Sequence, residues 1–329
     1  MAIPCVRVPR ERGEAARRRL AERDAVADGY EIGVQDGFLY VPLAPDADLA
    51  AIGERYEVVD REPAERATQT LPGDLLGVEP SYERLGDVAI VDEDDAGRAA
   101  ELAEAIVESD LPIDTVLNRA SPVEGPHRVR EWDVLAGEDT ETVHREYGCA
   151  FEVDVAEVYF SPRLATDRRR VVGQVADGES VFDMFAGVGP FVVPAAERGA
   201  DCVGVDLNGA AVEYLRRNAD RNGVADRVTA IHGDVRDVTG YDDWADRIVM
   251  NLPHTAADFL DTAVRLAGDD CVVHYYDIQP DDDPYAAGER AIRAAAEPDY
   301  GTAVESRRTV RSYAPHESNV RLDVRLATA

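Results

Sequence analysis

The sequence contains no lysine. All 35 basic residues are arginine, against 66 aspartates and glutamates, and the formal net charge is -31. Cysteine is also scarce: Cys5, Cys149, Cys202 and Cys271 are scattered and form no CxxC pair. Their scatter excludes a disulfide framework and a cysteine-rich zinc site, and it is typical of a protein in a reducing cytoplasm.

Long apolar runs are absent too. No segment approaches the roughly 18–20 residues that a transmembrane helix needs. The stretch MAIPCVRVPRERGEAARRR lacks the apolar core of a secretory signal. We therefore expect a cytoplasmic protein with no membrane partner. Hydrophobic residues make up 45% of the 329 positions, enough for a sizeable core, and the length favours about two domains.

The acidic residues are spread along the whole chain rather than gathered in one tail. This pattern, without lysine, is typical of an extreme halophile with a salt-filled cytoplasm. In molar salt the Debye length is only about 3 Å, so much of the self-repulsion is screened. The acidity then reflects the solvent and does not exclude a nucleic-acid partner. Arginine clusters at 17–19, at 168–170 and at Arg307, Arg308 and Arg311 are either RNA contacts or solvated faces.

Hydrophobic periodicity predicts three regions. Residues 1–67 combine an arginine-rich helical pattern, ERGEAARRRLAERD within residues 1–25, with a hairpin and a short helix, which together form a small α+β module. A polar, proline-containing linker follows, and residues 75–160 form a second α+β module. Residues 161–329 alternate strand and helix, which indicates βαβ units with a doubly wound, mostly parallel sheet.

The third region carries polar residues where successive strands end. They are the turn Asp183-Met-Phe-Ala-Gly-Val-Gly-Pro, then Asp206, then Asp234, then Asn251-Leu-Pro. Ligands of open parallel sheets bind at this edge, so the four features predict a nucleotide-like cofactor pocket. The turn is neither GxxxxGK[ST] nor GxGxxG, and its acid would repel a pyrophosphate. An acid suits a cationic ligand without phosphate, which favours S-adenosylmethionine and methyl transfer over hydride transfer.

The segments DMFAGVGPF, VDLN, GDV and NLP resemble the class I, Rossmann-like methyltransferase core. Together with RVREWDVLAGE, VYFSPRL and SYAP, they resemble the archaeal tRNA (guanine-37 N1)-methyltransferases. The resemblance covers about residues 80–329 well and the N-terminal module more weakly. It implies that the acceptor is N1 of guanine-37, beside the tRNA anticodon, and that the N-terminal module contacts the tRNA body.

The resemblance also implies catalytic roles. N1 of guanine carries a proton at neutral pH, so the reaction needs a general base and a cation near O6. Asp167 aligns with the family's base, where Glu is common, and its side chain is one methylene shorter. Arg128 aligns with the arginine near O6, with Arg130 as its neighbour. Asn251 aligns with the catalytic asparagine, and Pro253 stiffens its turn.

For the cofactor, we expect Asp206 to hold the ribose hydroxyls. Asp234 and Val235 should flank the adenine, and Phe185, Gly187 and Gly189 should line the methionine end. Arg168 resembles a family residue at the cofactor carboxylate. Leu207 and Asn251 complete the predicted cofactor contacts. A simpler explanation for Asp167 is a favourable contact with the helix dipole. The simpler explanation for Arg128 and Arg168 is a solvated surface charge.

Three alternatives stay open from the sequence. The chain could methylate another acceptor or RNA position, methylate a wyosine precursor, or bind RNA without catalysis. Leu252 stands where the N-P-P-Y motif of amine methyltransferases has proline, which argues against an exocyclic amine. The histidines His144, His232 and His274 are not at metal-ligand spacing, so we expect no metal, and we expect a monomer.

Overall fold

The structure is a computed structural model that describes residues 2–66, 69–122, 125 and 129–328. Contacts within the chain divide it into two units, Met1–Thr70 and Leu71–Ala329. We describe each unit by itself. Within the described residues, no helix is long and apolar enough to cross a membrane.

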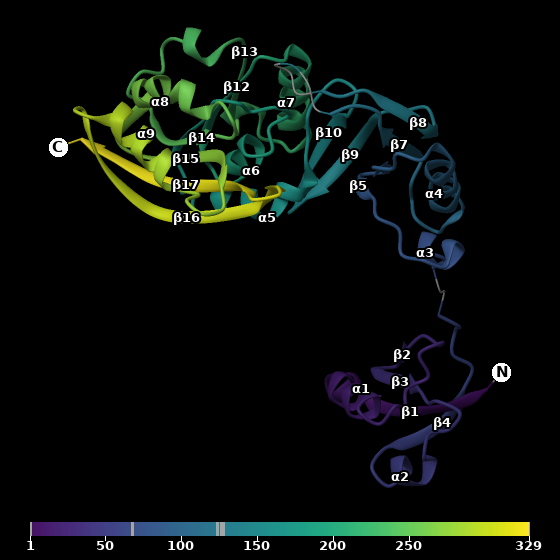
Figure 1. The fold of residues 1–329 in the computed structure, drawn as a ribbon. Helices are drawn as coiled ribbons and strands as arrows, with labels where there is room; N and C mark the ends of the chain where they lie inside the picture. The colour runs from purple at the N-terminus through teal and green to yellow at the C-terminus, as the bar shows by residue number, and fades with distance from the viewer. Residues whose placement is uncertain (1, 67–68, 123–124, 126–128, 329) are drawn as a thin grey trace. The chain divides into compact units, whose positions relative to one another are not determined.

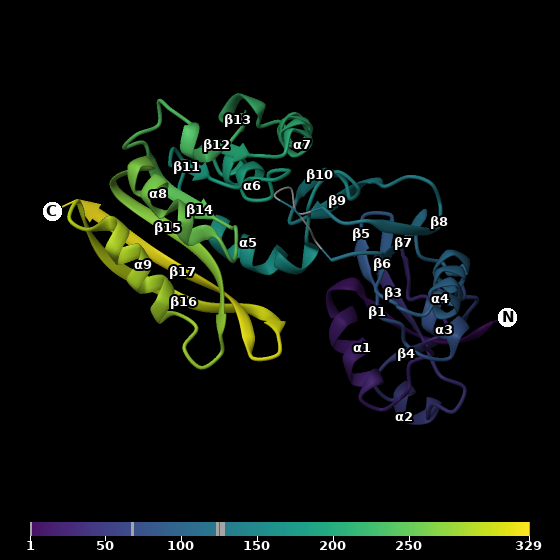
Figure 2. The same ribbon diagram turned by 45° about the horizontal axis from the view of Figure 1, so that its top comes forward.

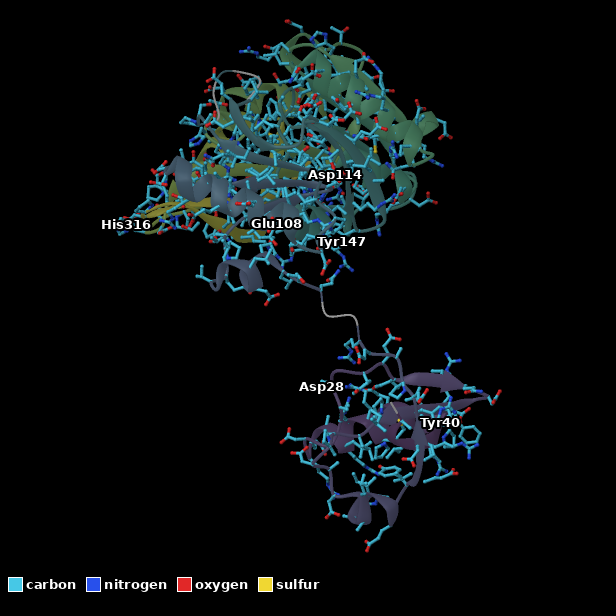
Figure 3. All side chains as sticks on the ribbon, turned by 90° about the vertical axis from the view of Figure 1, so that its right-hand side faces the viewer. Asp28, Tyr40, Glu108, Asp114, Tyr147 and His316 are labelled. Atoms are coloured by element: carbon cyan, nitrogen blue, oxygen red, sulfur yellow. The ribbon has the colours of Figure 1, made fainter. Side chains whose placement is uncertain are left out.

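The smaller unit is a four-stranded antiparallel sheet in the order β2-β3-β1-β4 (Figure 1). Figure 3 labels two of its residues, Asp28 and Tyr40. Its apolar core joins the strands to the two helices. The elements are β1 (Ile3–Pro9), α1 (Gly13–Ala21), β2 (Gly33–Gln35), β3 (Phe38–Pro42), α2 (Leu49–Gly53) and β4 (Glu57–Arg61).

The strand β1, which the sequence analysis did not predict, precedes the arginine-rich helical pattern. The segment IPCVRVP has two prolines, which remove backbone donors, and two valines, which favour strands. The arginine-rich helix α1 begins only at Gly13. The predicted hairpin is confirmed by the pairing of β2 with β3.

The larger unit begins with a four-stranded sheet in the order β5-β6-β7-β8 and a separate hairpin, β9–β10. The bounds are α3 (Pro72–Leu76), β5 (Glu83–Leu85), β6 (Val88–Val91), α4 (Ala96–Glu108), β7 (Thr115–Arg119), β8 (Trp132–Ala136), β9 (Glu141–Glu146) and β10 (Cys149–Asp154).

The rest of the larger unit is built on a seven-stranded sheet in the order β13-β12-β11-β14-β15-β17-β16. Pairs from β13 to β15 are parallel, whereas β17 pairs antiparallel with both of its neighbours. The strands are β11 (Ser180–Asp183), β12 (Asp201–Asp206), β13 (Val228–His232), β14 (Ala245–Met250), β15 (Ala267–Pro280), β16 (Tyr300–Ala314) and β17 (Glu317–Thr328).

Helices cover both faces of this sheet, and Figure 2 shows α8 and α9 beside the long strands β15 to β17. Because strand residues alternate between faces, Val181 packs with α6 and α7 while its neighbour Phe182 packs with α8 and α9. The mostly parallel, doubly wound sheet is thus confirmed. The helices are α5 (Ala165–Val172), α6 (Val192–Glu197), α7 (Gly209–Arg221), α8 (Leu260–Leu266) and α9 (Ala286–Ala296).

The predicted boundary near residue 160 falls inside the larger unit. Leu117 and Phe151, from before that boundary, share one apolar core with Val181 and Leu215 from after it. The buried Asn218 of α7 accepts a hydrogen bond from the backbone nitrogen of Glu152 at 2.6 Å and donates to that residue's carbonyl oxygen at 3.1 Å. Residues 75–160 are therefore packed firmly onto the sheet that follows them.

Candidate active site

A cavity of about 680 Å³ lies along the edge of the seven-stranded sheet where the parallel strands end. Every strand of this sheet contributes to the cavity, either directly or through the loop that follows it. In sheet order from β13 to β16, the contributing residues include Asp234, Asp206, Gly187, Asn251, Ile278, Asn319 and Arg311. The edge predicted from the sequence is therefore the edge that carries the cavity.

The turn after β11 is shaped for close approach. Gly187 has φ of 53° and Gly189 has φ of 91°, conformations that side chains rarely adopt. Gly187 lines the cavity, whereas Gly189 does not. A Cβ atom on Gly189 would lie 2.4 Å from Cδ1 of Leu215 in α7. The second glycine therefore allows the turn to pack against a helix, and only the first one faces the ligand space.

Asp206 fixes this turn from the neighbouring strand. Its Oδ2 accepts a hydrogen bond from the backbone nitrogen of Gly187 at 2.7 Å, and its Oδ1 accepts one from Asn208 at 2.8 Å. The carboxylate also lines the cavity, next to Leu207, whose side chain is 47% exposed. Asp206 thus stands at the cavity wall in a fixed position, as a ribose-binding acid requires.

The end of the cavity beside β13 is formed by Asp234, Val235 and two phenylalanines. Asp234 accepts a hydrogen bond from Nε of Arg236 at 2.9 Å, and this contact lowers the pKa of its carboxyl. Phe185 meets Phe259 edge to face, with ring centroids 5.0 Å apart. Apolar side chains and one charged pair therefore line this part of the cavity together, a chemistry that suits a nucleoside base.

Behind the glycine turn, Asp183 is completely buried. Its Oδ1 accepts from the backbone nitrogen of Phe185 at 3.1 Å, and its Oδ2 has no hydrogen-bond partner among the described residues. Burial, together with the nearby charge of Asp206, raises the pKa of this carboxyl to about 7. A cation bound at this strand end would favour the ionised form.

The loop after β14 brings Asn251, Pro253 and His254 to the cavity. Asn251 is half-buried, and its amide makes no hydrogen bond to the described residues. His254 has φ of 85° and lies 3.2 Å from the hydroxyl of Tyr313 on β16, measured from Nε2. The amide of Asn251 is therefore available to a ligand in the middle of the cavity.

Asp167, the predicted base, lies away from the cavity in a buried polar network. Its Oδ2 accepts from the hydroxyl of Tyr276 and its Oδ1 accepts from Arg321, both at 2.7 Å. Arg321 also donates to Asp323, which contacts Nδ1 of His274 at 2.6 Å. This carboxylate ties α5 to β15 and β17, and it does not line the cavity.

Arg168 does line the cavity, but its charge is already matched. Its Nε donates to Glu146 at 2.9 Å, and its Nη1 donates to the carbonyl oxygen of Ser161 at 3.0 Å. Burial opposes ionisation of Glu146, but hydrogen bonds from His144 and Arg168 outweigh it and lower the pKa of the carboxyl. No sequence pattern predicts Glu146 as the partner, because it comes from a hairpin more than twenty residues earlier in the chain.

Arg128, the predicted partner of the guanine O6, lies outside the described residues. Its neighbour Arg130 is described, and its guanidinium lies over the ring of Trp132 at 5.4 Å. Arg130 does not line the cavity, although Gly125 does. The described residues hold no group of three His, Cys, Asp or Glu side chains that could bind a metal ion.

The sequence missed the side of the cavity formed by β15 and β17. Ile278 and Asn319 line the cavity there. They are paired across β15 and β17 although they are far apart in the chain. The sequence analysis names Arg311 only as a member of an arginine cluster, and Tyr313 only within the segment SYAP. No local pattern could show that these residues share a cavity with Asn251.

A mostly parallel sheet with a glycine turn, an acid at the cavity wall and an asparagine at its strand ends defines a class I methyltransferase. Residues 142–304 match the TRM5/TYW2 methyltransferase domain, residues 5–51 the tRNA methyltransferase 5 N-terminal domain and residues 65–140 the TYW2 N-terminal domain. The tRNA (guanine(37)-N(1))-methyltransferase Trm5b of Pyrococcus abyssi is 40% identical, over 98% of each chain. The chain therefore belongs to the tRNA (guanine-37 N1)-methyltransferase family.

Solved structures are similar over all or most of the chain. The complex of aTrm5 with tRNALeu has a TM-score of 0.72 and 31% identity, and covers 98% of this chain and 99% of its own. Methanocaldococcus jannaschii TYW2 bound to AdoMet has a TM-score of 0.62 and 28% identity, and covers 76% of this chain and 100% of its own. A relative with another activity, the tRNA(Phe) (4-demethylwyosine(37)-C(7)) aminocarboxypropyltransferase of Pyrococcus horikoshii, is 31% identical over 79% of this chain and 94% of its own.

Proposed function

We propose that this protein transfers a methyl group from S-adenosylmethionine to N1 of guanine-37 in tRNA. The observation that carries the proposal is the order of the residues along one cavity: the acids for a nucleoside lie at the β13 and β12 end, and the available amide of Asn251 lies beyond them. The 98% overlap with Trm5b, including the N-terminal unit, supports this acceptor.

The cavity residues fit S-adenosylmethionine, which supplies an electrophilic methyl group on a sulfonium. Asp206 accepts hydrogen bonds from ribose hydroxyls, and Val235 and Leu207 enclose the base. The buried acid Asp183, instead of a phosphate cradle, stands behind the glycine turn. The cavity volume lies within the usual range of roughly 300–1,000 Å³ for sites of this kind.

Methyl transfer requires the chain to orient the guanine, to stabilise charge on O6 and to remove the N1 proton. Asn251 holds the guanine edge so that N1 faces the methyl group, and Pro253 keeps the loop rigid. A cation stabilises the negative charge that develops on O6, and we assign this role to Arg128. A base removes the N1 proton, and Asp167 stays our prediction for this role. Its present contacts with Tyr276 and Arg321 mean that this role requires a movement of α5.

The competing reactions use the same cavity. Aminocarboxypropyl transfer moves a different carbon group from the same cofactor, and a methylated wyosine precursor would present a larger, tricyclic acceptor. The aminocarboxypropyltransferase relative aligns to 79% of this chain, whereas Trm5b aligns to 98%. The match of residues 5–51 to the tRNA methyltransferase 5 N-terminal domain therefore favours methylation of the unmodified guanine.

The decisive assay uses labelled S-adenosylmethionine in molar potassium chloride with two tRNA transcripts, one carrying guanine at position 37 and one carrying adenine. We expect methyl label only in the guanine transcript, and digestion should map it to N1. Label at another position, or a product carrying the aminocarboxypropyl group, would replace this function with one of the alternatives. Cofactor binding without transfer to either transcript would point to a modified precursor.

We further propose that the enzyme works as a monomer in a salt-rich cytoplasm. The four cysteines are free and buried, which suits a reducing compartment. The lysine-free, acidic composition suits concentrated salt. Size-exclusion chromatography with light scattering in molar salt would test the oligomeric state.

A further inference from the structure

The end of the cavity beyond Asn251 holds an unusual pair. Arg311 of β16 and Asn319 of β17 are directly opposite each other, and both line the cavity. Nε of Arg311 and Oδ1 of Asn319 are buried, and neither has a hydrogen-bond partner among the described residues. One atom is a donor and the other an acceptor, so a small shift would pair them with each other. Such unpaired buried atoms are costly, and they often mark a site that a ligand completes.

The backbone of β16 is distorted at this position. The pairing register with β17 shifts between Thr309 and Arg311 and again between Ser312 and Ala314. Each shift inserts an extra residue on β16, a β-bulge, and bulges commonly re-aim side chains beside active sites. Tyr313, within the second bulge, lines the cavity and meets the ring of His254 edge to face at 5.2 Å. The bulges thus direct Arg311 and Tyr313 at the same space.

Among the described arginines that line the cavity, Arg311 differs from the others. Arg168 is paired with Glu146 and Arg236 with Asp234. Arg311 has no ion pair with any described residue, in a chain with nearly twice as many acidic as basic residues. A half-buried guanidinium without a counter-charge in a ligand cavity is suited to an anion.

The order of the strands indicates which anion Arg311 is placed to bind. The two acids assigned to the nucleoside part of the cofactor follow β13 and β12, at one end of the sheet, and Arg311 lies on β16, at the other end. The loop of Asn251 lies between them. We propose that Arg311 binds a phosphate oxygen of the acceptor nucleotide, and that Asn319 positions its guanidinium through Nε. This rests on the proposed function, because it assumes an RNA acceptor.

The first test measures RNA binding without turnover. Wild type, Arg311→Gln and Arg311→Lys are titrated with a fluorescent anticodon stem-loop in the presence of S-adenosylhomocysteine. Arg293→Gln on α9, outside the cavity, is the matched control for loss of one positive charge. We expect Arg311→Gln to weaken RNA binding about tenfold or more, with the Lys variant in between and the control unchanged. The salt slope of binding should fall by about one in Arg311→Gln only.

The second test separates the nucleotide phosphate from the carboxylate of the cofactor. A stem-loop with a neutral methylphosphonate on the 5′ side of nucleotide 37 should bind wild type as weakly as the unmodified RNA binds Arg311→Gln. The same linkage should cause no further loss in the variant. Calorimetry should give equal S-adenosylmethionine affinity for wild type and variant. A loss of cofactor affinity with unchanged RNA binding would assign Arg311 to the cofactor and overturn the proposal.

Asn319→Leu tests the positioning role. If Asn319 acts only through Arg311, the variant raises KM for tRNA with little change in kcat, and adding it to Arg311→Gln has no further effect. Additive losses would contradict that role. Because the two Arg311 tests are binding measurements, an inactive wild type would refute the proposed reaction without affecting them. Unchanged RNA affinity in Arg311→Gln would refute the phosphate contact even in an active enzyme.

Discussion

Two carboxyl groups stand at the ends of adjacent strands, and they differ in how they are held. Asp206 accepts two backbone hydrogen bonds at the cavity wall, whereas Asp183 is fully buried with one oxygen unpaired. Backbone donors stabilise a carboxylate, and burial without donors destabilises it. The raised pKa of Asp183, about 7, therefore makes this residue sensitive to pH in the neutral range.

This sensitivity predicts how cofactor binding changes with pH. S-adenosylmethionine carries a sulfonium and an ammonium, and it should bind more tightly when Asp183 is ionised. We expect its affinity to rise as the pH increases from about 6 to about 8, through the pKa of the free protein. Asp183→Asn, which imitates the protonated acid, should remove most of this change. Calorimetry at several pH values tests the prediction, and S-adenosylhomocysteine, without the sulfonium, should show a weaker dependence.

The stability of the free protein should change in the opposite direction. The folded pKa of Asp183 is raised above its unfolded value of 3.8, so the folded state holds an extra proton between about pH 4 and 7. The contribution of Asp183 to the stability of the folded state is greatest below that pH window and is lost as the pH rises through it. Relative to Asp183→Asn, wild type should therefore lose thermal stability from pH 5 to pH 8. Parallel curves for the two proteins would contradict the buried-acid interpretation.

Sequence reasoning worked at this scale where strand ends define the position of a side chain. Asp206, Asp234, Val235, Leu207, Phe185, Gly187 and Asn251 were predicted to contribute to one pocket, and all of them line the cavity. It was less informative where a side chain's partner is distant in the chain. Arg168 is bound by Glu146, and Asp167 by Tyr276 and Arg321, and no spacing rule relates those positions.

The helix α5 is held on the sheet by buried charges as well as by apolar contacts. Val171 and Val172 pack with Phe191 and Tyr276, and Asp167 adds its ion pair with Arg321. Burial and the charge of Asp167 raise the pKa of the Tyr276 hydroxyl well above its usual value, so this group remains a donor. The charge of the buried Arg321 is balanced by two carboxylates, those of Asp167 and Asp323.

Removing one partner should therefore destabilise the protein. Asp167→Ala leaves Arg321 with Asp323 as its remaining partner, and breaking a buried pair costs roughly 3–5 kcal/mol. We expect a clear fall in the unfolding free energy in urea, and a smaller fall for Asp167→Asn. If Asp167 is also the base, Asp167→Asn should lower kcat at neutral pH with partial recovery as the pH rises. A stable Asp167→Ala protein would mean that the network has little structural importance.

The hairpin of β16 and β17 is an element that the sequence analysis did not predict. The residues of β16 alternate between exposed and half-buried, a pattern that suits an edge strand. Most of these positions are polar or charged. The apolar pattern that identifies buried strands is therefore weak on β16. His316, in the turn of the hairpin, lies at the outer edge of its unit (Figure 3). The residues that β16 and β17 bring to the cavity were found only after their pairing with β15 was known.

On the scale of the whole molecule, the net charge of -31 predicts that salt stabilises the protein. Many exposed arginines are already paired, so the excess of carboxylates repel one another. Raising potassium chloride from about 0.1 M to about 1 M shortens the Debye length from about 10 Å to about 3 Å. We expect the melting temperature to rise over this range. Sorbitol at matched osmolality, which does not screen charge, should have a smaller effect, and equal effects would contradict a screening mechanism.

The cavity belongs to one of the two units. The cavity is lined only by residues of the unit Leu71–Ala329, and the N-terminal unit has its own apolar core. We therefore expect a protein comprising residues 71–329 to bind S-adenosylmethionine with the affinity of the full chain, because no cofactor contact is removed.

The same truncation should weaken the enzyme toward tRNA, because the N-terminal unit is expected to contact the tRNA body. KM for full-length tRNA should rise, whereas KM for an isolated anticodon stem-loop should be the same for both proteins. Comparing the two substrates separates loss of an RNA contact from damage to the active site, since damage would raise both values or lower cofactor affinity. An unchanged KM for full-length tRNA would assign the N-terminal unit a role other than binding that substrate.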